Sequence, residues 1–365
     1  MAPQPTVLVL GGVGFIGRNF VAHLVENDLA VEIRVVDKVL PQTAYLNQRF
    51  KNAFTKVEFM QGNLSNAESV ARCFSRADGS SFDYVFNFAA ETKFSQPDEI
   101  YEDRIYRLST ICAKEAVKRD VKVFVHISTG DIYESSKSAS KEDSKAKPWN
   151  KMAEYKLKVD KELLDMAGLN LVILRPAVVY GVGALGGLTP RLICGRVYQH
   201  LKQKMSFLWT KDLRINTVHV TDVARACWHT ATTFNGTTAI YNLADENDTD
   251  QEAINTHIRS IFGIETGYQG TALSLLASTN MEGATEDTNE MHLAPWSDIL
   301  KANNIKTSPL TPYLDQELLL NNALSLNGTK ICASTGFKYE HPTLTEESLR
   351  EIITDFQELG IWPRD

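Results

Sequence analysis

A glycine-rich turn lies near the start of the chain, between an apolar run at residues 6–10 and a helical pattern at residues 15–25. Gly11, Gly14 and Gly17 are spaced so that the chain turns tightly and its backbone approaches a bound phosphate closely. The N-terminus of the following helix offers free N–H donors and the positive end of a dipole to that anion. The turn therefore predicts the first strand–turn–helix unit of an α/β domain that binds a phosphate-bearing ligand.

An acidic residue, Asp37, ends the next apolar run, 20 residues after Gly17. A carboxylate at this place accepts hydrogen bonds from the adenosine ribose and repels a 2′-phosphate. We therefore predict NAD as the cofactor. Lys38 keeps NADP open as an alternative, because its cation would accommodate the phosphate.

Short apolar runs alternate with helical patterns through the first half of the chain. The expected strands are residues 6–10, 32–36, 57–60, 84–88, 123–127 and 171–174. The expected helices are residues 15–25, 67–74, 98–118 and 151–167. This alternation predicts an α/β fold with a Rossmann-type, doubly wound parallel sheet, in which ligands bind beyond the carboxyl ends of the strands.

The pattern loosens after Gly181, although residues 189–201 and 223–233 still indicate helices and residues 239–243 a strand. We expect residues 1–181 to form the NAD-binding domain, with its sheet completed by residues 215–245. We expect residues 182–214 and 246–365 to form a smaller, substrate-binding part.

Composition excludes several classes of protein. With 38 basic and 45 acidic residues the net charge is −7, which argues against a protein that binds nucleic acid through phosphates. No apolar run approaches 18 residues, and the N-terminus lacks a basic signal-peptide region, so we expect a cytoplasmic chain without a membrane span. Five scattered cysteines without a CxxC spacing indicate reduced thiols and no metal site.

Further motifs carry a resemblance to a known family. They are Gly62-Asn63-Leu64, Ala89-Ala90, the run from Ser128 to Tyr133, the run from Leu174 to Gly181, Arg214 with residues 218–223, and Gly336-Phe337-Lys338. With the glycine turn, they make nearly the whole chain similar to the extended short-chain dehydrogenase/reductases, in the NAD-dependent epimerase/dehydratase group.

The resemblance implies a set of binding residues. Those expected at the cofactor are Gly11, Gly14, Phe15, Ile16, Gly17, Asp37, Lys38, Asn63, Leu64, Ala89, Ala90, Lys156 and Pro176. Those expected at the substrate, a nucleotide sugar, are Thr92, Arg191 and Arg214, because arginines can clamp a diphosphate with paired hydrogen bonds. A homodimer built on the helices at 98–118 and 151–167 is also implied.

The reaction centre departs from the family pattern. Similar enzymes use a hydroxyl donor with a tyrosine and a lysine four residues apart on one helix face. Here Lys156 occupies the lysine position, but Met152 occupies the tyrosine position, and a thioether cannot exchange a proton. We expect Thr129, Asp131, Tyr155 and Lys156 to form the catalytic set, with the proton moved by either Asp131 or Tyr155. Arg104 replaces the family's helper asparagine.

Three functions remain open from the sequence. The first is an epimerase/dehydratase-type enzyme that starts by moving a hydride from a sugar carbon to NAD. The second is a 3β-hydroxysteroid dehydrogenase-like oxidoreductase with an apolar pocket lined by Leu273, Leu275 and Leu276. The third is a catalytically inactive NAD-binding protein, suggested by Met152.

Overall fold

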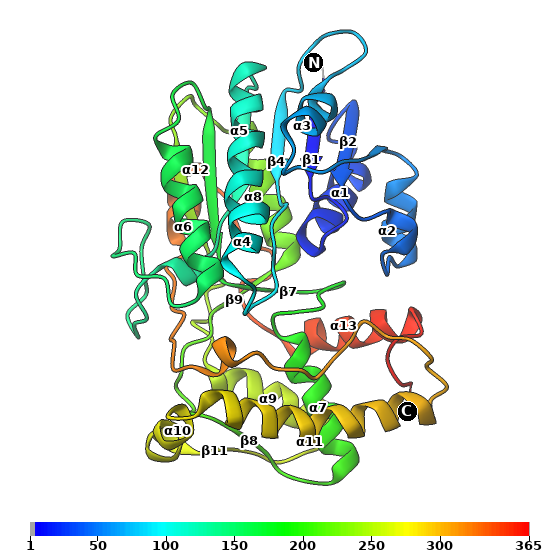
Figure 1. Cartoon of the computed structure of the whole chain (residues 1–365), viewed down its shortest axis with the longest axis vertical. Coiled ribbons are helices and arrows are strands. Elements are labelled where there is room, and N and C mark those ends of the chain that lie inside the picture. Colours follow the sequence, from blue (N-terminus) through cyan, green and yellow to red (C-terminus); the bar gives the residue numbers. More distant parts are fainter. Residues whose placement is uncertain (1–3, 365) are drawn as a thin grey trace.

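A seven-stranded parallel sheet forms the centre of the computed structural model, which describes residues 4–364 (Figure 1). Its strands are β1 (Thr6–Leu10), β2 (Glu32–Asp37), β3 (Glu58–Gln61), β4 (Tyr84–Asn87), β5 (Val123–Ile127), β6 (Leu171–Pro176) and β10 (Ala239–Leu243). Their order in the sheet is β10-β6-β5-β4-β1-β2-β3, so the predicted Rossmann-type fold is confirmed. The order reverses between β1 and β4, where such sheets bind their ligands.

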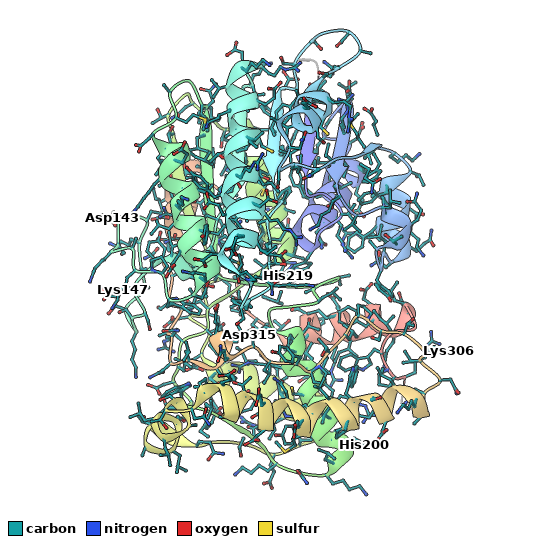
Figure 2. The ribbon with its side chains drawn as sticks, in the orientation of Figure 1. Asp143, Lys147, His200, His219, Lys306 and Asp315 are labelled. Carbon is teal, nitrogen blue, oxygen red and sulfur yellow. The ribbon has the colours of Figure 1, made fainter. Side chains whose placement is uncertain are left out.

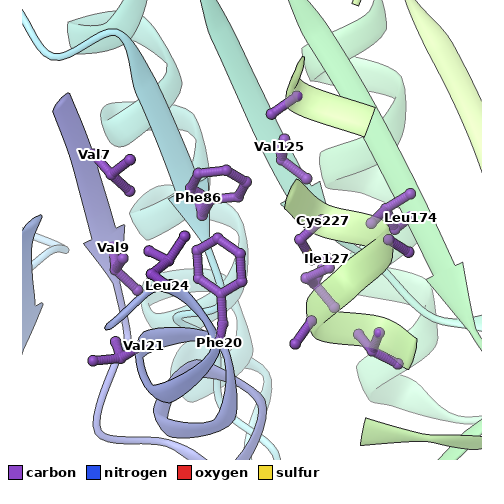
Figure 3. Packing of buried hydrophobic residues seen from close by; sticks show 14 of the residues in the cluster. Val7, Val9, Phe20, Val21, Leu24, Phe86, Val125, Ile127, Leu174 and Cys227 are labelled. Atoms are coloured by element: carbon purple, nitrogen blue, oxygen red, sulfur yellow. The ribbon is translucent and has the colours of Figure 1, made fainter. Parts of the chain in front are cut away.

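Helices cover both faces of this sheet. One face carries α1 (Phe15–Glu26), α2 (Gln48–Phe54) and α8 (Val220–Thr232), and the other carries α3 (Ala67–Phe74), α5 (Leu108–Lys118) and α6 (Lys151–Leu164). Figure 3 shows the first face, where the rings of Phe20 and Phe86 lie 4.3 Å apart between centroids. The β-branched strands are buried on both faces, as expected for a parallel sheet.

The helix expected at residues 98–118 is divided into three pieces. A π-helical segment, η2 (Glu102–Arg107), separates α4 (Asp98–Tyr101) from α5. Such widened turns occur mostly as bulges near functional sites. The segment carries Arg104, the residue at the helper position.

A second group of elements lies beyond the carboxyl ends of the strands (Figure 1). It contains α7 (Thr189–Leu201), β8 (Met205–Phe207), α9 (Gln251–Phe262), β11 (Thr266–Tyr268), α10 (Gly270–Ser278), α11 (Met281–Ala302) and α13 (Glu346–Glu358). It has its own buried core, which includes Leu192, Ile258, Trp296 and Ile352. Between the two groups, β7 (Val178–Tyr180) pairs with β9 (Thr217–His219). The remaining short helices are η1 (Pro41–Thr43), η3 (Gly130–Ile132) and η4 (Gln316–Leu319).

One late segment lies with the sheet rather than with the smaller part in which it was expected. Helix α12 (Thr329–Thr335) contacts β10, and Ile331 and Phe337 are buried in the core on the α1 face. These two apolar side chains explain the placement, because they cover the edge of the sheet.

Within residues 4–364, no helix is long and apolar enough to cross a membrane.

Candidate active site

The glycine turn leaves no room for side chains where it meets the sheet. A Cβ atom on Gly11, whose φ is +76°, would lie 2.6 Å from the backbone nitrogen of Ala89. A Cβ atom on Gly17 would lie 2.3 Å from the carbonyl oxygen of Gly11. Gly14 immediately precedes the first residue of α1, with Phe15 and Ile16 partly exposed after it. These residues fit a dinucleotide, because backbone N–H groups at a helix start are free to hold a diphosphate.

Asp37 is fixed beside this turn at the end of β2. Its Oδ2 accepts a hydrogen bond from the Val13 N–H at 3.0 Å, and its Oδ1 accepts one from the Val39 N–H at 3.0 Å. The carboxylate is largely buried, and each oxygen keeps capacity for a further hydrogen bond. Lys38 is exposed. The geometry therefore suits a carboxylate that accepts ribose hydroxyls.

The other expected cofactor residues lie at neighbouring strand ends. Asn63 accepts a hydrogen bond from the Ser65 N–H through Oδ1 at 3.0 Å, and Leu64 is buried. Ala89 and Ala90 pack against the core on the α5 face, directly after β4. Pro176 is the last residue of β6.

Arg18 lies beside the residues expected at the cofactor, and the sequence did not single it out. Its Nε donates to the carbonyl of Val13 at 3.0 Å, and its Nη1 donates to the carbonyl of Tyr45 at 3.1 Å. Burial lowers the pKa of Arg18 to about 10, although Asp355 and Asp37 favour the charged form. Arg18 thus ties the glycine turn to the loop after β2. Its place directly after Gly17 was the available signal.

Thr129 and Asp131 stand together just past the end of β5. The Thr129 Oγ1 accepts a hydrogen bond from the Asp131 N–H at 3.2 Å. The Asp131 Oδ2 accepts one from Asn150 Nδ2 at 3.1 Å. Burial raises the pKa of Asp131 to about 6, against the opposing effect of the Asn150 hydrogen bond. A carboxyl of this kind changes its protonation state near neutral pH.

Lys156 reaches the same strand end from α6. Its Nζ donates to the carbonyl of Ile127, the last residue of β5, at 2.8 Å. Burial lowers the pKa of Lys156 to about 8, and the nearby Asp160 opposes this shift. The structure therefore brings Thr129, Asp131 and Lys156 to one place.

Tyr155 does not join this group in the structure. Its ring lies 5.8 Å from the ring of Tyr101, and the Lys158 ammonium lies 5.7 Å from the Tyr155 centroid. Its side chain lines a surface hollow together with Asp98, Glu99, Glu102, Asp103 and Arg107. Because Lys156 is buried on the other side of α6, the two neighbours face different ways. Met152 is half-buried and packs against the core.

Arg104 is paired with a carboxylate. Its Nη1 donates to Glu91 Oε2 at 2.9 Å. Burial alone would raise the pKa of Glu91, but the bond from Arg104 and the backbone N–H groups of Lys93 and Thr92 outweigh it, and the pKa is lowered. The positive charge of Arg104 is therefore balanced by the carboxylate of Glu91. The side chain of Thr92 is exposed.

The two expected substrate arginines differ sharply. Arg214 is held by Asp248 at 3.2 Å and by Asp250 at 3.1 Å. Arg191 donates from Nη2 to Gln251 Oε1 at 3.2 Å, and within residues 4–364 its buried Nη1 has no hydrogen-bond partner. Arg191 thus keeps a buried unused donor, whereas Arg214 is already paired with two carboxylates.

An apolar pocket lined by the C-terminal leucines would favour the steroid-oxidoreductase alternative, but these leucines are exposed. Leu273, Leu275 and Leu276 are 57%, 54% and 68% exposed on α10. The buried residue of this helix is Ser274, whose Oγ accepts from the Trp209 N–H at 2.6 Å. The hydroxyl faces inward, and the leucines face outward.

Comparison with known proteins identifies curated relatives that match part of the chain. Curated relatives include dTDP-glucose 4,6-dehydratases of Actinoplanes sp. (26% identical over 144 residues, 37% of this chain and 43% of the relative) and Mycobacterium tuberculosis (29% over 133 residues, 35% and 37%). The matches thus span less than half of each relative's length.

Solved structures with the same fold cover almost the whole chain. They include MoeE5 in complex with UDP-glucose and NAD (TM-score 0.66, 18% identical, 96% of this chain and 98% of that one). Another is the UDP-glucose 4-epimerase of Thermus thermophilus in complex with NAD (TM-score 0.67, 19% identical, 96% and 99%).

The family model described as the NAD dependent epimerase/dehydratase family matches residues 7–244, which contain the glycine turn, Asp37, Thr129 and Lys156. The chain belongs to this NAD-dependent family.

Proposed function

We propose that the chain is a nucleotide-sugar epimerase/dehydratase-type enzyme that binds NAD and begins by oxidising a sugar carbon. The observation that carries this proposal is the convergence of Thr129, Asp131 and Lys156 at the end of β5, in the same sheet edge as the glycine turn. Bound NAD would supply the hydride acceptor.

The residues present suggest separate roles. Gly11, Gly14 and Gly17 leave the backbone free for the diphosphate, and Asp37 accepts the adenosine ribose hydroxyls. Lys156 holds the nicotinamide ribose from its buried position. Thr129 donates to the reacting oxygen of the substrate, and Asp131 moves a substrate proton, for which a pKa of about 6 is well suited.

A nucleotide sugar is the substrate class that we propose. The relatives' names and the titles of the solved structures point to dTDP- and UDP-sugars. Arg191 is the stronger candidate for the diphosphate, because Arg214 is already neutralised by two carboxylates. The leucines of α10 are exposed, so they do not line a steroid pocket at that helix.

We also propose a cytoplasmic homodimer that meets across the helical segments at residues 98–118 and 151–167. All five cysteines are free thiols, as in a reducing compartment. The outer face of η2 and α6 carries the Lys158–Glu102 ion pair, 2.8 Å long, and half-buried Tyr106 and Tyr155. Sedimentation should give twice the 40.8 kDa of one chain, and a species of 40.8 kDa would contradict the dimer.

A catalytically inactive NAD-binding protein is the second candidate. Met152 favours it, since a half-buried thioether stands where similar enzymes carry the proton-moving tyrosine, and Tyr155 faces away. This candidate predicts NAD binding without NAD reduction in the presence of any sugar.

The two candidates separate in a mutational test of the half-reaction. With pooled UDP- and dTDP-sugars and stoichiometric NAD⁺, Thr129→Val and Asp131→Asn should each lower the rise at 340 nm by about 10²-fold. Lys141→Gln, an exposed change, is the control and should have no effect. Unchanged rates in both site variants would contradict the proposed roles.

A further inference from the structure

The segment that contains the short helix η4 is fastened by hydrogen bonds to three other parts of the chain. The Trp209 Nε1 donates to the carbonyl of Leu319 at 2.8 Å, and Ser95 Oγ donates to Asp315 Oδ1 at 2.9 Å. Farther along, the Ala323 N–H donates to Ser135 Oγ at 2.8 Å. Figure 2 places Asp315 between the sheet and the second group of elements. The segment is thus held against the loops that follow β4 and β5, which both contribute to the site.

Glu317 of η4 presents its carboxyl to the first turn of α6. The groups that face it are Asp315 on its own segment, Lys151 and Glu154 on α6, and Tyr101 on α4. Met152 belongs to that same turn. Asn150, the residue before α6, holds Asp131. Two carboxyls, Asp131 and Glu317, therefore lie at the N-terminus of α6, the helix end whose first turn carries Met152.

One oxygen of Glu317 is left without a partner. Its Oε2 is buried, and within residues 4–364 it accepts no hydrogen bond. An unsatisfied buried acceptor costs roughly 1–3 kcal/mol, so natural proteins rarely keep one without a use. A substrate hydroxyl would supply the missing donor.

We propose that Glu317 takes the proton of the reacting substrate hydroxyl, in place of the tyrosine absent at Met152. This inference rests on the proposed function. In the step, the O–H bond breaks and its proton goes to Glu317 Oε2 as a carbonyl forms. NAD, when bound, would accept the hydride from the same carbon. Asp131 is then free to remove the proton of the neighbouring carbon, which the carbonyl makes acidic.

The surroundings of Glu317 suit a proton carrier. Burial and then the charge of Asp315 raise the pKa of Glu317, while the backbone of Lys151 opposes them. A raised pKa makes a carboxylate a better base, as long as it is ionised at the working pH. A purely structural role, as an anion stabilising the start of α6, is the alternative to be tested.

Three variants separate these roles: Glu317→Gln removes the base, Glu317→Asp keeps it, and Asp165→Asn removes an exposed acid from the other end of α6 as a control. With pooled nucleotide sugars and NAD⁺, we expect Glu317→Gln to lower the rate at 340 nm by about 10²-fold or more, Glu317→Asp to restore most of it, and Asp165→Asn to leave it unchanged. NAD affinity should be equal in all four proteins.

Carboxyl ¹³C NMR of the protein without ligands supplies an independent readout. The signal lost in Glu317→Gln should titrate above the usual range of glutamate, and the wild-type rate should rise with pH through that midpoint. A rate in Glu317→Gln within threefold of wild type would overturn the inference alone. Absence of NAD reduction by wild type would overturn the proposed function and this inference together.

Discussion

Asn150 connects Asp131 to the helix that carries Lys156. Its Nδ2 donates to Asp131 Oδ2 at 3.1 Å, and its Oδ1 accepts from the Ala153 N–H at 2.8 Å, which caps the start of α6. One side chain thereby fixes both the carboxyl and the helix start.

Asn150→Ala should therefore lower the free energy of unfolding by about 1 kcal/mol, the usual value of a lost cap. Asn150→Ser is the matched variant, because serine keeps the cap but is too short to hold Asp131. At pH 3.5, where Asp131 is largely protonated in both states, it should preserve the unfolding midpoint in urea, and it should raise the pKa of Asp131. Equal stability of the alanine and wild-type proteins would show that the cap is not needed.

Gly17→Ala should weaken NAD binding. Its new Cβ would lie 2.3 Å from the Gly11 carbonyl oxygen, so the turn must shift, at a cost of roughly 1–3 kcal/mol. Gly186→Ala is the control, because a Cβ there meets no atom within 4 Å. Fluorescence titration with NADH measures both variants. If Gly17→Ala binds NADH as tightly as wild type, the glycine turn does not hold the dinucleotide.

Asp37→Asn should reduce the preference for NAD over NADP by about tenfold, or ~1.4 kcal/mol, since the charge that repels the 2′-phosphate is lost. The remaining side-chain oxygen can still accept one of the two backbone hydrogen bonds. Asp78→Asn, at an exposed residue away from the turn, should not change the ratio. Calorimetry with NAD and with NADP measures the ratio of the two affinities. An unchanged ratio in Asp37→Asn would mean that Asp37 does not determine the preference for NAD.

Asp131 should make the protein less stable as pH rises from about 4 to about 6. Burial raises its pKa from 3.8 to about 6, so between these values the folded state binds more protons than the unfolded state, and stability falls with pH. Asp131→Asn should remove this loss and be more stable than wild type at pH 7, by roughly 1–3 kcal/mol, with no gain at pH 3.5. Urea denaturation of both proteins at pH 7 and at pH 3.5 measures this difference in stability. A variant less stable than wild type at pH 7 would contradict the direction.

The sequence predicts the cofactor half of the molecule well. Glycine spacing around Gly11 and Gly17, short apolar runs and an acid at the end of the second run are local signals. They follow from backbone sterics and from burial of a parallel sheet, so they are visible without the fold.

The reaction centre depends on which residues meet in space, which the sequence does not reveal. Tyr155 and Lys156 are neighbours in the chain, yet α6 turns them to different sides. The resemblance predicts Arg214 as a substrate residue, but the sequence does not reveal that Asp248 and Asp250 form ion pairs with it. No sequence motif around Glu317 indicates a functional role. Its position beside α6 results from contacts between residues more than 100 positions apart.

We predict that hydride chemistry persists in this protein without the usual tyrosine. The most direct test follows absorbance at 340 nm after purified wild-type protein, loaded with stoichiometric NAD⁺, is mixed with pooled UDP- and dTDP-sugars. Met152→Tyr, which rebuilds a tyrosine four residues before Lys156, is run beside it. We predict a rise with wild type. No rise with wild type, despite measured NAD binding and a clear rise with Met152→Tyr, would contradict the claim and show a binding protein that lost its proton carrier.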